Sequence, residues 1–235
     1  MSKEWLERAE LLYHTEGLDH LNKTTVMVCG VGGVGSFALE ALVRSGIGTF
    51  LLVDHDRSTL NNMNRQLLAT IQTVGEIKVE LAKKRIAEIN PEATVYAIAD
   101  FFQGDLENFL AEHGLENLKI DYIIDAIDSV RAKTELIASA HRLHIPIISA
   151  MGAGNKFDPT RFKVGDLFKT SYDPIAKVLR RNLRKLNIKH HKVVFSEEIP
   201  KTREHDTTIG STAFVPPVCG MICASVVVRD LLQIN

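Results

Sequence analysis

A glycine-rich segment near the start of the chain has the composition of a phosphate-binding turn. Residues 29–35 read C-G-V-G-G-V-G and end an apolar run that begins at Val26. Glycines let the backbone turn tightly and approach a phosphate, and a helix that begins there supplies N–H groups and a positive dipole. Asp54 ends the next apolar run, where a carboxylate can hold ribose hydroxyls. These features fit NAD, FAD or ATP, and a tight turn without a ligand is the alternative.

Two basic residues that follow Asp54 help to distinguish between these three ligands. Arg65 lies in the segment N-N-M-N-R-Q, and Lys78 ends the segment G-E-I-K. A hydride-transfer enzyme has no need for cations that converge on the phosphates of its cofactor. Attack of a carboxylate on the α-phosphate of ATP, in contrast, concentrates negative charge there and on the departing pyrophosphate, and fixed cations stabilise it. Either residue alone could be a solvated charge on a helix surface, but together they favour adenylation.

A third group of polar residues ends another apolar run, in the segment D-A-I-D-S at residues 125–129. Ligands sit at the carboxyl ends of parallel strands, so this segment belongs to the same edge of the predicted sheet. Asp125 helps to end the strand, and Asp128 could reach Mg²⁺ on the triphosphate. The alternative for Asp128 is a plain capping role at the helix that follows.

These residues require a scaffold that brings distant segments to one edge of a sheet. Short β-branched runs alternate with helical patterns along the chain, which is the order of a parallel sheet with crossover helices. We predict a Rossmann-like α/β fold, doubly wound and mostly parallel, with an N-terminal helical arm and a C-terminal extension. The predicted strands are 26–29, 50–53, 94–98, 122–125, 146–150, 162–164 and 193–196. The predicted helices are 33–45, 60–70, 77–89, 129–142, 214–232 and one that begins at Pro174 and packs through Ile175, Leu179, Leu183 and Leu186. We expect a single domain over 1–235, with a nucleotide-binding core at 24–151 and a crossover loop, basic helix and C-terminal helix at 152–235.

Composition excludes several classes of protein. Hydrophobic residues make up 45% of the chain and charged residues 24%, as in ordinary globular proteins. No stretch approaches the ~20 apolar residues that span a bilayer, and the N-terminus lacks the apolar run of a signal peptide. We therefore expect a cytoplasmic protein without membrane association. The three cysteines, Cys29, Cys219 and Cys223, include no C-x-x-C pair, so a four-thiolate zinc site is excluded and we expect all three to pack in the interior.

In combination these motifs resemble the ThiF/MoeB/HesA family, the bacterial relatives of ubiquitin-activating enzymes. The resemblance covers residues 8 to 151 and implies an adenylating enzyme that uses ATP and Mg²⁺. The ATP-binding residues that it implies are Gly30, Gly32, Gly33, Gly35, Asp54, Asp56, Asn62, Arg65, Gln66, Lys78 and Asp128. Arg65, Lys78 and Asp128 would be catalytic, and Asp128 would support the metal. The family is dimeric, and the resemblance implies a homodimer in which Arg8 reaches the neighbouring subunit's site.

Many relatives pass an acyl group to a cysteine in the crossover segment, but this chain has no cysteine from Met151 to Pro217. The whole chain instead resembles the branch that dehydrates threonylcarbamoyladenosine in tRNA. That branch adenylates the threonylcarbamoyl carboxylate at position 37 and then closes a ring, which needs no enzyme-bound acyl carrier. The branch also implies a monovalent cation, K⁺ or Na⁺, near residues 151–168. Two alternatives stay open: activation of the C-terminal glycine of a ubiquitin-like or sulfur-carrier protein, and an NAD-binding redox protein.

The helix that begins at Pro174 is strongly basic and fits a tRNA substrate. No acidic residue occurs between Pro174 and Lys192. Phosphate contacts of this kind position tRNA without reading its sequence, whereas a solvated helix face is the simpler alternative. The predicted tRNA-binding residues are Lys177, Arg180, Arg181, Arg184 and Lys185. Sulfur-transfer proteins are further candidate partners.

Overall fold

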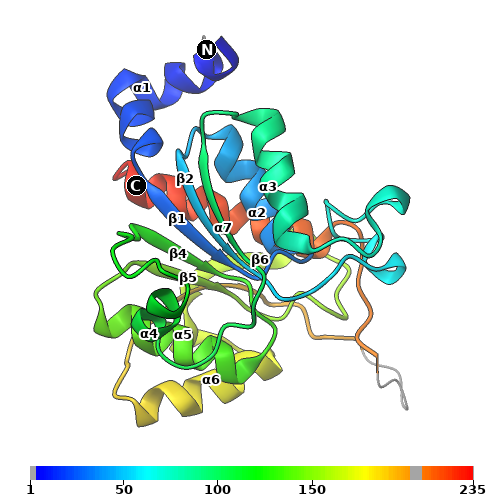
Figure 1. Cartoon of the computed structure of the whole chain (residues 1–235). Helices are drawn as coiled ribbons and strands as arrows, with labels where there is room; N and C mark the ends of the chain where they lie inside the picture. Colours follow the sequence, from blue (N-terminus) through cyan, green and yellow to red (C-terminus); the bar gives the residue numbers. More distant parts are fainter. Residues whose placement is uncertain (1–3, 202–207, 235) are drawn as a thin grey trace.

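The computed structural model describes residues 4–201 and 208–234. Its centre is a seven-stranded sheet in the order β3-β2-β1-β4-β5-β7-β6 (Figure 1). The strands are β1 (Thr25–Cys29), β2 (Thr49–Val53), β3 (Thr94–Ile98), β4 (Tyr122–Asp125), β5 (Ile147–Ala150), β6 (Phe162–Asp166) and β7 (Lys192–Ser196). Neighbouring strands pair in parallel except β6, which runs antiparallel to β7. The predicted mostly parallel α/β sheet is confirmed.

Helices cover both faces of this sheet (Figure 1). The helices are α1 (Glu7–Asn22), α2 (Gly35–Arg44), α3 (Lys78–Ile89), α4 (Leu106–Glu112), α5 (Val130–Arg142), α6 (Pro174–Lys185) and α7 (Val215–Leu231). One buried apolar cluster joins the sheet to α2, α3 and α7, and a second joins its other face to α4, α5 and α6. Because helices bury both faces of the sheet, its strands read as continuous apolar runs in the sequence. Within the described ranges, we find no helix with the length and apolarity to cross a membrane.

The register of the central strands places the motifs side by side. Cys29, the last residue of β1, pairs with Val53 of β2 and with Asp125 of β4. The three strands therefore end at the same level, and the segments that follow them leave the sheet together. This pairing brings the glycine turn, Asp54 and the turn after Asp125 to one edge.

The structure corrects the predicted elements in three places. Residues 60–70 form no regular helix: one short 3-10 turn, Leu60–Asn62, is followed by irregular chain, and a second turn, Ile71–Thr73, lies beyond this range. Asparagine and threonine side chains there bond to nearby groups and compete with helical hydrogen bonds, as when the Thr59 N–H donates to Asn62 Oδ1 at 3.2 Å. Helix α4, which the sequence analysis missed, begins at an Asp105 cap whose carboxylate accepts from the Glu107 N–H. Helix α6 ends at Lys185, so Leu186 lies beyond it and is exposed instead of packed.

All three cysteines are buried, and the prediction that they pack in the interior is confirmed. Burial raises the pKa of the Cys29 thiol well above its usual range, and the pKa of Cys223 is raised by its contact with Cys219 and by burial. Neither thiol is therefore ionised near neutral pH.

A buried histidine connects α5 with β5 and β7. His191 Nε2 lies 2.8 Å from Ser149 Oγ, and His191 Nδ1 lies 3.4 Å from His141 Nε2. Burial lowers the pKa of His191 to about 3, with smaller contributions from His141 and Lys133. The folded protein therefore holds this imidazole neutral, whereas the unfolded chain protonates it below its ordinary pKa of 6.5.

We expect this histidine to make the protein sensitive to acid. Between pH 6.5 and 3 the unfolded state binds a proton that the native state does not, so stability falls as pH falls, by at most about 1.4 kcal/mol per pH unit. Chemical denaturation of wild-type protein and His191→Gln at several pH values tests this. The variant should lose part of the wild-type slope below pH 6.5. Parallel curves would contradict the assignment.

Candidate active site

A cavity of 580 Å³ opens at the carboxyl ends of the central strands. It brings together residues from the glycine turn, the end of β2, the segment before α3, the start of α3 and the turn after β4. The predicted ATP-site residues in its lining are Gly30, Gly32, Gly33, Asp54, Asp56, Asn62, Arg65, Gln66, Lys78 and Asp128. Gly35 and Arg8 do not line it: Gly35 is buried at the start of α2, and Arg8 is exposed on α1. The roles of all these residues in binding stay predictions.

The glycines of the turn serve two different purposes. Gly30 has φ +86°, and a Cβ there would lie 2.6 Å from the Ala126 carbonyl oxygen. A Cβ at Gly35 would overlap the Gly30 carbonyl oxygen, so these two positions shape the turn itself. A Cβ at Gly32 would meet no protein atom closer than Gln66 Nε2 at 3.6 Å. Gly32 therefore has room on the protein side and keeps the cavity open for a ligand.

Alanine substitutions should separate the two purposes. Gly32→Ala should weaken ATP binding while the melting temperature stays close to that of the wild type, since the methyl group occupies ligand space. Gly35→Ala should lower the melting temperature, because backbone atoms must move to admit the methyl group. Thermal unfolding with and without ATP measures both effects. Equal destabilisation by the two variants would contradict this distinction.

Asp54 fixes the glycine turn to the end of β2. Its Oδ2 accepts from the Val31 N–H at 2.7 Å, and its Oδ1 accepts from the Asp56 N–H at 2.8 Å. The side chain is nearly buried against the cavity wall. Each carboxylate oxygen has a second lone pair, so these bonds leave acceptor capacity for ribose hydroxyls.

The two predicted cations lie in the same cavity but have different partners. Lys78 is buried, and its Nζ lies 2.6 Å from Asp56 Oδ2. Arg65 is partly exposed, and its Nη1 donates to the Asn61 carbonyl oxygen at 2.8 Å and to Asn64 Oδ1 at 2.9 Å. Neither cation is neutralised by a buried counter-ion. The Asp56 side chain that pairs with Lys78 is half exposed, and both acceptors of Arg65 are uncharged. Both cations therefore remain able to donate to phosphate oxygens in the cavity.

Asp128 is exposed at the cavity and is free to bind a ligand. Within residues 4–201 and 208–234, no side chain or backbone group hydrogen-bonds or pairs with its carboxylate. Ser129 is the residue that caps α5, by accepting from the Ala132 N–H at 3.4 Å. The capping alternative for Asp128 is therefore wrong.

A buried ion pair supports the turn that carries Asp128. Lys133 and Asp125 are fully buried, with 2.8 Å between Nζ and Oδ1. Lys133 Nζ also donates to the Ala150 carbonyl oxygen at 3.1 Å, and Asp125 Oδ1 accepts from the Ile127 N–H at 3.2 Å. The pair thus links the end of β4 to the end of β5 and holds in place the first residue of the turn at 126–128.

The end of the cavity near β5 is built from residues that the sequence analysis did not assign. Asp173 is buried, caps α6 through the Ala176 N–H at 2.9 Å, and accepts from the Gly152 N–H at 2.8 Å. Lys156 Nζ donates to the Gly152 carbonyl oxygen and lies 3.5 Å from Asp173 Oδ2. The Asp-Pro pair before a helix could have indicated the cap, but Lys156 stands in a loop without a pattern.

Two aromatic rings form another part of the wall. His55 and Phe101 follow β2 and β3 and meet edge to face, with ring centroids 5.0 Å apart. Both line the cavity. Both residues lie shortly after the end of a strand, and this was the only signal in the sequence. It places them at the carboxyl edge of the sheet but assigns them no function.

The basic helix α6 begins at this cavity. Asp173, Pro174 and Ile175 line it. The exposed cations farther along the helix are Lys177, Arg181, Arg184 and Lys185. Arg180 differs, because its Nη1 donates to the carbonyl oxygen of Thr170 at 3.0 Å and to Thr170 Oγ1. Arg180 therefore holds the turn before α6, which weighs against its predicted contact with tRNA.

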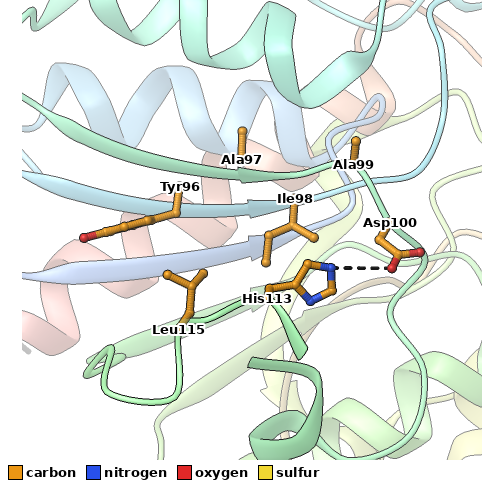
Figure 2. Close-up of a pocket in the computed structure, with 7 residues that line it drawn as sticks. All are labelled: Tyr96, Ala97, Ile98, Ala99, Asp100, His113 and Leu115. Carbon is orange, nitrogen blue, oxygen red and sulfur yellow. Dashed lines mark ion pairs between the residues drawn. The ribbon is translucent and has the colours of Figure 1, made fainter. Parts of the chain in front are cut away.

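A separate hollow of 430 Å³ lies beside the edge strand β3 (Figure 2). It contains one ion pair, with 3.5 Å between His113 Nε2 and Asp100 Oδ2, and otherwise apolar and aromatic side chains (Figure 2). His113 Nδ1 is held by the Phe109 carbonyl oxygen at 2.8 Å. The hollow has no arginine or lysine among its lining residues, so it offers nothing comparable with the phosphate-binding set.

Comparison with known proteins identifies what this arrangement resembles. The profile of the ThiF family matches residues 6–235. The chain is 46% identical over 243 residues to the tRNA threonylcarbamoyladenosine dehydratase of Bacillus subtilis, covering 96% of this chain and 94% of that protein. The structure of the E. coli tRNA N6-threonylcarbamoyladenosine dehydratase in complex with AMP aligns with a TM-score of 0.89 and 34% identity, over 99% of this chain and 96% of that one. Its complex with ATP aligns with a TM-score of 0.88 and 35% identity over the same shares.

Proposed function

Because the chain belongs to the ThiF family, we propose that it uses ATP to dehydrate threonylcarbamoyladenosine at position 37 of tRNA. It is an adenylate-forming enzyme that activates the threonylcarbamoyl carboxylate and then closes a ring. The observation that carries this proposal is the composition of one cavity. Lys78, Arg65 and the free Asp128 carboxylate line it together with the glycine turn, and its lining also includes the first residues of the basic helix α6.

In the first step, a carboxylate oxygen of the substrate attacks the α-phosphorus of ATP, and pyrophosphate leaves. Negative charge grows on the phosphate oxygens during this displacement. Lys78 and Arg65 stabilise that charge from positions fixed before the reaction, which is where electrostatic catalysis gains most. Asp54 holds the glycine turn in place and has acceptor capacity for the ribose.

In the second step, a nitrogen of the same substrate side chain attacks the acyl carbon, and AMP leaves with the carboxylate oxygen. The nitrogen loses its proton, so the substrate has lost one water overall. A nucleophile on the same side chain has a high effective concentration and needs no acyl carrier. Cys29 does touch the cavity, but burial raises the pKa of its thiol, so it is no thiolate carrier.

Mg²⁺ fits the free carboxylate of Asp128. Carboxylate oxygens are the ligands that Mg²⁺ takes, usually together with substrate phosphates and water. When bound, the ion would neutralise charge on the triphosphate. The region around Gly152 does not fit a separate K⁺ or Na⁺, because the Lys156 ammonium already lies against the Gly152 carbonyl oxygen and the Asp173 carboxylate.

The exposed cations of α6 form the proposed tRNA surface. Lys177, Arg181, Arg184 and Lys185 face solvent and follow directly from residues that line the cavity. Phosphates of the anticodon stem on this helix would place the loop at the cavity mouth. Arg180 is left out of this surface because it bonds within the fold. A tRNA substrate also supports a cytoplasmic location.

The N-terminal arm supports a homodimer. Leu11 and Leu12 of α1 are highly exposed, and this helix stands at one end of the molecule (Figure 1). Covering these side chains would remove apolar surface from water. Arg8 on the same helix does not line the cavity of its own chain, which fits a contribution to a partner's site. The predicted sulfur-transfer partner stays a prediction.

Pyrophosphate exchange into ATP tests the choice of acyl substrate. Exchange should depend on tRNA that carries threonylcarbamoyladenosine and should be absent with unmodified tRNA. A carrier protein that ends in Gly-Gly should give no exchange. Exchange with the carrier and none with the modified tRNA would replace this proposal by protein activation.

A further inference from the structure

Tyr172 combines an exposed aromatic ring with a rarely adopted backbone conformation. Its φ is +64°, in the left-handed region that bulky side chains seldom occupy. The residue is 62% exposed. Within the described ranges, no hydrogen bond, ion pair or ring contact involves its side chain. The fold therefore maintains this conformation without any internal use of the ring.

The next residue explains how the conformation is held. Asp173 is fully buried and is fixed by the Gly152 N–H, the Ala176 N–H and the Lys156 ammonium. These contacts anchor the chain on the C-terminal side of Tyr172, and Arg180 anchors the turn on the N-terminal side through Thr170. Strained residues that their surroundings hold in place are concentrated at functional sites.

Tyr172 also stands at the junction of two parts of the proposed machinery. Asp173 and Pro174, which follow it, line the cavity. The exposed cations of α6 begin with Lys177, one turn farther along the chain. A tRNA that placed phosphates on α6 and one nucleoside in the cavity would therefore pass Tyr172.

We propose that Tyr172 stacks on the anticodon-loop base that neighbours the modified adenosine. Moving that adenosine into the cavity takes it away from its neighbour and leaves the neighbour's face exposed. An aromatic side chain is the usual partner for such a base, and it tolerates any base because each has a π face. This inference rests on the proposed function and adds a positioning residue outside the phosphate-binding set.

Three substitutions at Tyr172 test the inference in the full-length enzyme with modified tRNA. Tyr172→Phe keeps the ring and should leave KM for tRNA within about twofold of the wild type. Tyr172→Ala and Tyr172→Gly should raise that KM by about fivefold or more, as expected for a lost base stack, with kcat and ATP affinity unchanged. Phe157→Ala is the matched control, because Phe157 is similarly exposed but carries Lys201 over its ring at 5.0 Å.

The glycine variant separates stacking from a structural role. Glycine adopts a positive φ freely, so Tyr172→Gly should melt no lower than Tyr172→Ala and should still bind tRNA poorly. A tRNA with 2-aminopurine beside the modified adenosine gives a direct readout. Its fluorescence should be quenched by the wild type and by Tyr172→Phe but not by the alanine or glycine variants.

Several results would overturn the inference. An unchanged KM in Tyr172→Ala would do so, as would a phenylalanine variant as defective as alanine, or equal 2-aminopurine fluorescence in all variants. If the wild type forms no product from modified tRNA, the proposed function itself fails. If the wild type is active and the alanine variant matches it, the function stands and the stacking role alone is rejected.

Discussion

Replacing Lys78 by methionine should lower the rate of adenylate formation by about 10²- to 10³-fold while the protein remains folded. The side chain lies buried at the wall of the cavity, where a fixed cation stabilises charge on phosphate oxygens far better than a solvated one does. Methionine keeps the length of the chain and removes the charge. The pair with Asp56 contributes little to stability, because the Asp56 side chain is half exposed and returns to water. Pyrophosphate exchange and AMP release measure the effect.

Lys84→Met is the matched control for this substitution. Lys84 lies on the same helix α3 and pairs with a carboxylate at nearly the same distance, 2.7 Å to Glu76 Oε2, but it is exposed and lies outside the cavity. We expect its activity to stay within about twofold of the wild type. If Lys78→Met retained more than about a tenth of wild-type activity, Lys78 would not be the catalytic cation.

Replacing Lys133 by methionine should give a large loss of stability, about 3–5 kcal/mol. Removal of one partner of a buried ion pair leaves the other charge without compensation. Asp125 is fully buried, and its Oδ2 has no hydrogen-bond partner among the described residues even with Lys133 in place. The ends of β4 and β5 would also lose the link through the Ala150 carbonyl oxygen. Chemical denaturation measures the change in the free energy of unfolding.

Two further variants make this prediction specific. Lys133→Met combined with Asp125→Asn removes both charges and should recover part of the lost stability, because no buried charge is then left unpaired. Arg131→Met breaks an exposed pair with Glu135 on the same helix and should cost less than about 1 kcal/mol. Similar losses of unfolding free energy in Lys133→Met and Arg131→Met would show that the buried pair contributes no more to stability than the exposed pair does.

The phosphate-binding half of the site could be predicted because its residues follow strands directly. The glycine turn, Asp54 and Asp128 each come after an apolar run, and parallel strands bring their carboxyl ends to one edge. Local sequence and topology together therefore determined where these side chains would meet. The short segment at 60–70 was predicted wrongly, because its asparagine and threonine side chains compete with the backbone for hydrogen bonds.

The wall near β5 could not be predicted from local sequence. Lys156 and Asp173 meet through a tertiary contact between a loop and a helix start, and no periodic pattern announces it. Arg180 shows the reverse case. The buried positions Ala176, Leu179 and Leu183 place Arg180 beside the packed face of α6, so helical periodicity could have separated it from the exposed cations. The number of basic residues along this segment does not by itself distinguish Arg180 from the exposed cations.

In the proposed reaction, the residues of the cavity promote activation and cyclisation of a carboxylate on tRNA. The most direct test is mass spectrometry of the nucleosides from threonylcarbamoyladenosine-containing tRNA after incubation with the enzyme, ATP and Mg²⁺. A threonylcarbamoyladenosine product lighter by one water, formed together with AMP and absent without ATP or with Lys78→Met, is the predicted result. An unchanged nucleoside profile under conditions in which the protein is folded and binds ATP would contradict the proposed dehydration.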